Sequence, residues 1–139
     1  MLFLLPSCKA TQELTPQDLA EKNYQNNCDF CNAGQGDYTA LYPGSTIIYE
    51  DDYVFAFKKS SKREALIVPK KHRENIKSLN TNNSDDQQIV LHIIKAAQKL
   101  SSMLSGSQDY QLHINNGAKA GQTTFHLHVH FIPAEPWKK

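Results

Sequence analysis

The chain has 139 residues, of which 40% are hydrophobic and 21% charged, a composition typical of one globular domain with its own core. Its 15 basic and 14 acidic residues leave a net charge of +1. This excludes a strong overall positive charge that would attract nucleic acid or an anionic membrane. We therefore expect no nucleic-acid partner, and any anionic ligand must be held by a local site.

Residues 1–24 are interpreted as an appendage to a main domain at residues 25–139. Thr15 suits the N-cap of a helix and Pro16 its first position, so one short helix is predicted in this appendage.

The apolar opening Met1–Leu5 is too short to cross a membrane and lacks the basic start of a secretory signal, which favours a cytoplasmic location. Residues 5–8, however, resemble the end of a bacterial lipoprotein signal. The alternative is therefore a lipoprotein anchored through Cys8, if the true start lies upstream.

Three strands are predicted in the first half of the main domain. Residues 46–50 and 53–57 are rich in β-branched and aromatic side chains and flank Asp51 and Asp52, which predicts a hairpin. Residues 64–68 form a nearly continuous apolar run closed by a proline, as is typical of a central strand.

One long helix is predicted to begin at Ser84 and to stop at Gly106. Its apolar residues repeat at helical spacing, at Ile89, Ile93, Ala97, Leu100 and Leu104. His92 falls outside this stripe and is expected at the surface. Strands at 109–115 and 125–132 follow, joined by a loop. The fold class predicted is α+β, a five-stranded, largely antiparallel sheet with one long helix packed on it.

The last strand predicted places a histidine at every second position: His126, His128 and His130. The period of a strand puts these imidazoles on one face about 7 Å apart, while the intervening apolar residues fill the opposite face. Such a row offers nitrogen ligands or nucleophiles. The alternative is a solvated or metal-adhering edge strand.

Two of the three cysteines form the motif Cys28-x-x-Cys31, whose thiols suit a redox pair, a metal site or a buried core. A tetrahedral zinc site needs two more ligands, and no second such pair exists. His72 and His126 are the best candidates, although redox or buried thiols remain open on these residues alone.

The loop before the histidine row is a candidate phosphate site. It carries Asn115, Gln122 and Thr123 with two glycines, and free backbone N–H groups in such a turn can hold phosphate oxygens. A plain connecting loop is the alternative. Seven lysines and arginines between residues 58 and 73 are interpreted as solvated surface, with attraction of a polyanionic substrate as the alternative.

These pieces together resemble the histidine-triad (HIT) superfamily of nucleotide hydrolases and transferases, and its Hint-type branch most. The resemblance runs from about Cys28 to Ile132 and covers most of the chain. It rests on five motifs in order: Cys28-x-x-Cys31, the hairpin 49–57, Leu66 to His72, Asn115-Asn116-Gly117, and Gly121 to His130.

The resemblance implies a nucleotide-binding homodimer. His128 would be the nucleophile that attacks the α-phosphorus to give a nucleotidyl-histidine intermediate. His130, Gln122 and Thr123 would bind and polarise phosphate oxygens, and Asn115 would help to shape the pocket.

The resemblance also implies a bound Zn²⁺, because Cys28, Cys31, His72 and His126 match the ligands of zinc-bearing relatives.

One region departs from the pattern. Hint-type proteins carry an acidic residue for the ribose hydroxyls and a histidine leading the next strand, whereas Lys58, Lys59 and Glu64 occupy this region here.

The sequence thus predicts a zinc-stabilised hydrolase or nucleotidyltransferase acting on a purine nucleotide or nucleoside phosphoramidate, or on dinucleotide-like substrates. The alternatives are a nucleotide-binding regulatory protein without appreciable turnover and a zinc-binding structural module.

Overall fold

The structure is a computed structural model that describes residues 27–60 and 62–139; the helix predicted near Thr15 and the anchor proposed at Cys8 lie outside them. Five strands form one sheet in the order β1-β2-β3-β5-β4, and every neighbouring pair is antiparallel. The strands are β1 (Ser45–Glu50), β2 (Val54–Lys59), β3 (Ala65–Pro69), β4 (Tyr110–His113) and β5 (Val129–Pro133). The predicted hairpin and central strand are confirmed, since β3 has two strands on each side.

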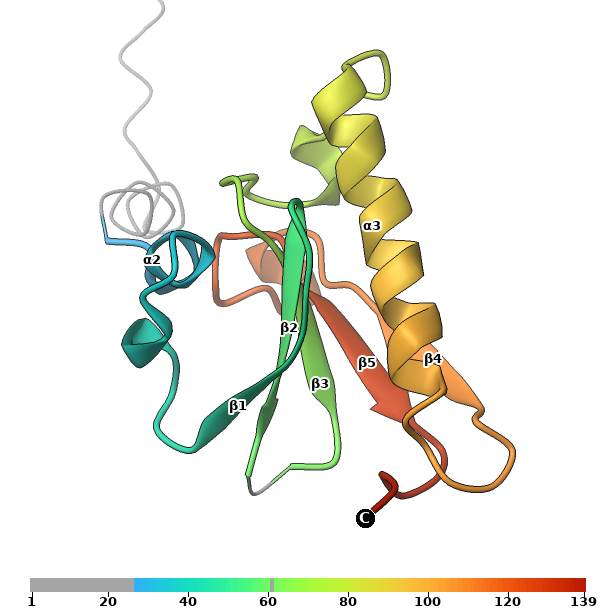
Figure 1. Ribbon diagram of the computed structural model, residues 1–139. Coiled ribbons are helices and arrows are strands. Elements are labelled where there is room, and N and C mark those ends of the chain that lie inside the picture. The colour runs from blue at the N-terminus through green and yellow to red at the C-terminus, as the bar shows by residue number, and fades with distance from the viewer. Residues whose placement is uncertain (1–26, 61) are drawn as a thin grey trace, which may run out of the picture.

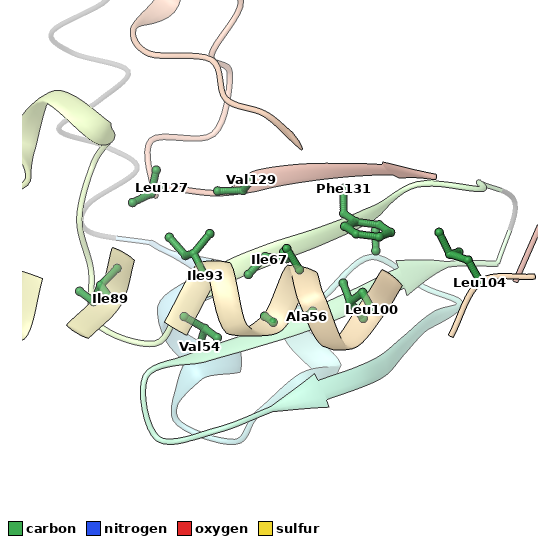
Figure 2. Packing of buried hydrophobic residues seen from close by; sticks show 13 residues of the cluster. Val54, Ala56, Ile67, Ile89, Ile93, Leu100, Leu104, Leu127, Val129 and Phe131 are labelled. Atoms are coloured by element: carbon green, nitrogen blue, oxygen red, sulfur yellow. The ribbon is translucent and has the colours of Figure 1, made fainter. Parts of the chain in front are cut away.

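A single long helix, α3 (Ser84–Ser101), crosses one face of the sheet (Figure 1). Its buried stripe includes Ile89, Ile93 and Leu100, which point at apolar side chains of three strands (Figure 2). Those partners are Val54, Ala56, Ile67, Val129 and Phe131. The predicted α+β fold with one long helix on a five-stranded sheet is therefore confirmed.

The other face of the sheet is partly covered by α2 (Asp29–Gly34) and the short 3-10 helix η1 (Tyr38–Ala40). Because side chains alternate along β2, Phe55 and Phe57 face this side and form a second apolar cluster. Gly34 lies directly against the backbone of Lys70, where an added Cβ would come within 2.7 Å of the carbonyl oxygen. This close approach brings the α2 segment next to the end of β3.

Two boundaries differ from the prediction by more than two residues. The helix ends at Ser101 rather than at Gly106, although Leu104 is still buried and pairs with Trp137. Strand β5 begins at Val129 rather than at residue 125, because the Leu127 N–H donates to the Arg73 carbonyl at 2.6 Å instead of joining the ladder.

Two further 3-10 helices lie in connections between the elements: η2 (Ile76–Ser78) between β3 and α3, and η3 (Ala118–Ala120) between β4 and β5. No helix among the described residues has the length and apolar character that a bilayer crossing requires.

Candidate functional site

Each histidine of the row has one ring nitrogen held by an acceptor, which decides the nitrogen that it offers elsewhere. The His126 Nε2–H donates to the Pro69 carbonyl at 2.7 Å, and the His128 Nδ1–H donates to the His126 carbonyl at 2.8 Å. The Nδ1 of His130 lies 3.3 Å from a carboxylate oxygen of Glu64. A carbonyl or carboxylate can only accept, so the free nitrogen is Nδ1 in His126 and Nε2 in the other two.

The free nitrogen of His126 faces a compact set of metal-binding side chains. Its Nδ1 lies 3.2 Å from the Cys28 Sγ and 3.4 Å from the Cys31 Sγ. The His72 Nδ1 lies 3.7 Å and 3.3 Å from the same two sulfurs. Bond lengths of about 2.3 Å to sulfur and 2.1 Å to nitrogen around a tetrahedral zinc set sulfur–nitrogen separations of about 3.6 Å. The four distances therefore fit one zinc ion.

The local chemistry of this cluster also suits a metal. Burial lowers the pKa of His126 to about 4, so its imidazole is neutral and keeps the lone pair on Nδ1. Burial and the neighbouring Cys28 raise the pKa of Cys31 to about 12, so its thiolate needs a cation beside it. The closeness of the His72 Nδ1 to both sulfurs makes it the candidate ligand atom, and its Nε2 is buried without a hydrogen-bond partner among the described residues.

Helix α2 and the start of α3 hold these ligands in place. Cys28 is the N-cap residue of α2, and its sulfur accepts the Cys31 N–H at 3.1 Å. Arg73, next to His72, forms an ion pair with the buried Asp86 of α3, and its carbonyl accepts the Leu127 N–H. The guanidinium of Arg73 and the Asn80 N–H lower the pKa of Asp86.

A cavity of about 510 Å³ opens beside His128 and His130, on the sheet face opposite α3. This volume is in the range of small-molecule sites. Its lining has an apolar part with Phe30, Leu41, Pro43, Phe57 and Leu66. It also has a polar part with Thr123, Thr124, Lys59, Lys62 and Glu64.

The sheet register explains how the cavity combines apolar side chains with a histidine of the row. Phe57 of β2 pairs with Leu66 of β3, which pairs with His130 of β5, so the three side chains form one row across the sheet. His128 precedes the strand, and burial lowers its pKa, which favours the neutral form of its imidazole.

The structure brings most of the predicted site residues together. Cys28, Cys31, His72 and His126 form a cluster that could hold a metal, and Thr123, His128 and His130 line the cavity. Asn115 lies outside the cavity lining, where its Oδ1 accepts a hydrogen bond from the His113 Nε2 at 2.9 Å.

Gln122 requires a correction. Its side chain is buried, and its Oε1 accepts the Gly117 N–H at 2.8 Å. Its Nε2 donates to the carbonyls of Glu74 and Thr124 at 2.6 and 3.0 Å. Since both ends of the amide close the loop, the prediction that this side chain holds phosphate does not fit the geometry.

Two features were missed by sequence reasoning. Glu64, which directly precedes β3, contacts His130 of β5, and only the pairing of β3 with β5 reveals this contact. His92 is half-buried rather than at the surface, and its Nδ1 lies 2.7 Å from Asp51. Burial pushes the pKa of Asp51 up, but hydrogen bonds from His92, Tyr49 and two backbone N–H groups outweigh it and lower the pKa.

An antiparallel sheet with one crossing helix, a row of anchored histidines and an adjoining cavity defines a histidine-triad class of protein. Comparison with known proteins agrees, because the family model of the HIT domain matches residues 43–136. The chain belongs to the HIT family.

Individual relatives and structures give the same picture. An uncharacterised HIT-like protein of Synechocystis is 33% identical over 96 residues, which are 67% of this chain and 82% of that protein. Adenylylsulfatase HINT3 of Arabidopsis thaliana is 30% identical over 115 residues, 78% of this chain and 53% of that protein. A HIT family hydrolase from Clostridium thermocellum superposes with a TM-score of 0.64 at 38% identity, covering 78% of this chain and 90% of that one. The hydrolase neighbours support a general hydrolase or transferase role.

Proposed function

We propose that the chain is a Hint-type nucleotide hydrolase or nucleotidyltransferase that acts at the α-phosphorus of purine nucleoside phosphoramidates or dinucleotide-like substrates. The observation that carries the proposal is the setting of His128. Its Nδ1–H is bound to a backbone carbonyl, which leaves Nε2 as the nucleophilic nitrogen of a side chain that lines the cavity.

The reaction would run in two displacements. In the first, the His128 Nε2 attacks the α-phosphorus; a P–N bond forms, and the bond from phosphorus to the leaving group breaks as that group takes up a proton. In the second, water or another acceptor attacks the phosphorus, the P–N bond breaks, and the acceptor's proton is released. In this proposal His130 and Thr123, which line the cavity, hold phosphate oxygens, and the apolar part of the cavity holds the base.

We propose further that Cys28, Cys31, His72 and His126 bind one Zn²⁺. The agreement of their four sulfur–nitrogen separations with those of a zinc site supports this assignment. A bound zinc ion would neutralise the two thiolates and hold the segment before β5 against α2. The His126 carbonyl, which orients the His128 ring, belongs to the same segment.

A homodimer is also proposed. The outward face of α3 exposes Val90, Leu91 and Ile94, and the edge strand β4 exposes Leu112. Leu112 pairs with Phe131, whose side chain is in the core under α3, so both apolar surfaces lie on the same side of the sheet. A second copy would cover this surface and the free edge of β4. Sedimentation should show a dimer that Ile94→Glu with Leu112→Glu converts to monomer; a wild-type monomer at micromolar concentration would contradict the proposal.

The catalytic proposal is tested by turnover and binding in parallel. His128→Ala should lower kcat for a purine nucleoside phosphoramidate by about three powers of ten or more, while affinity for the nucleoside monophosphate is kept. His92→Gln is the matched control, because it changes a histidine of α3 on the opposite face and should turn over normally. Turnover that persists in His128→Ala would rule out the mechanism.

A further inference from the structure

The basic stretch between residues 58 and 73 divides into paired and unpaired cations. Outside the cavity, Lys70, Lys71 and Arg73 form ion pairs with Glu50, Asp85 and Asp86. Lys59 and Lys62 both line the cavity, and neither forms an ion pair with any residue that the structure describes. Lys59 and Lys62 therefore bring positive charge into the cavity that no ion pair neutralises.

The alternation of β2 explains why Lys59 faces the cavity. Lys59 lies two residues beyond Phe57, so both side chains share the face opposite α3. Its Nζ lies 4.6 Å from the ring centroid of Tyr42, another lining residue. The neighbouring Lys58 points to the α3 side, where its Nζ lies 5.6 Å from the Trp137 ring.

Two carboxylates line the cavity, those of Asp29 and Glu64, and neither forms an ion pair with Lys59 or Lys62. Glu64 lines the same part of the cavity, but its Oε2 lies 3.3 Å from the His130 Nδ1. Neither Lys59 nor Lys62 is its partner. An aromatic ring such as that of Tyr42 orients an ammonium group without neutralising it, so the charge stays available to a ligand.

The sheet register sets the separation of these cations from the reacting groups. His130 and Phe57 are two strands apart in one row, and Lys59 is two residues further along β2. Strand spacings of about 4.8 Å and a rise of about 3.4 Å per residue put the Lys59 and His130 backbones about 12 Å apart. Lysine side chains reaching into that gap can meet a group a few bonds from the attacked phosphorus.

We propose that Lys59 and Lys62 form a subsite for a second anionic group of the substrate, a phosphate or sulfate distinct from the phosphate that His128 attacks. This inference rests on the proposed function and narrows its substrate class. The second anion has two possible sources, the leaving group beyond the α-phosphorus or a phosphate on the ribose. Lysines in place of the acidic ribose contact expected for a Hint-type protein suit either source.

The subsite is tested by equilibrium binding, which needs no turnover. Calorimetry would compare a purine nucleoside 5′-monophosphate, the 5′-diphosphate and the 3′,5′-bisphosphate with the full chain. At least one doubly phosphorylated ligand should bind about tenfold more tightly than the monophosphate, and added salt should reduce this advantage. A gain with the diphosphate identifies the leaving group as the source, and a gain with the bisphosphate identifies the ribose.

Substitutions separate the subsite from the rest of the cavity. Lys59→Met with Lys62→Met should remove the tenfold preference and leave monophosphate affinity within about twofold, since the groups around His128 are unchanged. Lys58→Met is the matched control, because it removes the same charge from the same strand on the opposite face and should keep the preference.

Three outcomes would overturn the inference: no gain from a second phosphate, a preference retained in the double variant, or a preference lost equally in Lys58→Met. Binding of none of the three nucleotides would instead reject the proposed function itself. A normal His128-dependent turnover without any second-anion preference would reject the subsite alone.

Discussion

The two ends of the histidine row differ in burial, and with it in chemistry. His126 is fully buried between the sheet and α2, with one nitrogen on a backbone carbonyl and the other facing two thiols. His130, four residues on, is partly exposed at the cavity and contacts the Glu64 carboxylate. His128 lies between them and opens to the cavity while its Nδ1–H is tied to the His126 backbone.

This difference shows that spacing alone does not assign a role to a histidine. All three come from one alternating run, yet the acceptor that each ring meets decides which nitrogen is free and what that nitrogen faces. We therefore propose that the buried end holds a metal and that the open end meets a substrate. Predictions that treat the two ends separately follow from this contrast.

Metal removal should give the largest effect on stability. At a thousandfold excess of free zinc over Kd, binding would stabilise the fold by about 4 kcal/mol, and chelation should remove this contribution. His126→Ala should lose both zinc and stability, whereas His128→Ala should keep both, as measured by metal analysis and denaturant unfolding. Equal zinc content and stability in the two variants would contradict the proposed difference between the two ends of the histidine row.

Replacing the carboxylate at the open end should lower activity and leave stability alone. Glu64→Gln keeps a side-chain oxygen for the His130 Nδ1–H but removes the charge, so kcat should fall about tenfold with KM nearly unchanged. Asp52→Asn, an exposed acid of the β1–β2 turn, is the matched control. A drop in zinc content or in melting temperature with Glu64→Gln would show that the open end also supports the metal cluster.

The burial of His128 should also have a smaller effect, which appears in the pH dependence of turnover. Because burial lowers the pKa of His128 below its ordinary value of 6.5, the free nitrogen stays available under mildly acidic conditions. The rate should fall as pH falls and protonation occupies the lone pair, with a midpoint below 6.5. Activity profiles recorded with zinc content checked at each pH give this midpoint, and a value above 6.5 would contradict the buried setting.

Hydrophobic patterning predicts much of this fold. The strands around Tyr49, Phe55 and Ile67 and the helical stripe of α3 follow local periodicity, so they are visible in one sequence. The ligand set Cys28, Cys31, His72 and His126 was inferred from ligand chemistry and the family resemblance, and the structure brings these four residues together.

The features that escaped prediction depend on contacts between distant segments. Strand β5 starts late because Arg73 captures the Leu127 N–H, and His92 is drawn in by Asp51, 41 residues away. Gln122 is a polar residue in a glycine-rich loop, a position typical of a phosphate ligand. Its amide instead forms hydrogen bonds with the Gly117 N–H and two carbonyls. No local periodicity encodes such partners.

The most direct test of the account is a search for the covalent intermediate on His128. Wild-type protein would be mixed with a purine nucleoside phosphoramidate, quenched within the first turnover and digested for mass spectrometry. The account predicts a nucleotidyl adduct on the peptide that carries His128, and none in His128→Ala with its zinc retained. An adduct on His126, on His130 or on any other residue, or full turnover through no adduct at all, would contradict it.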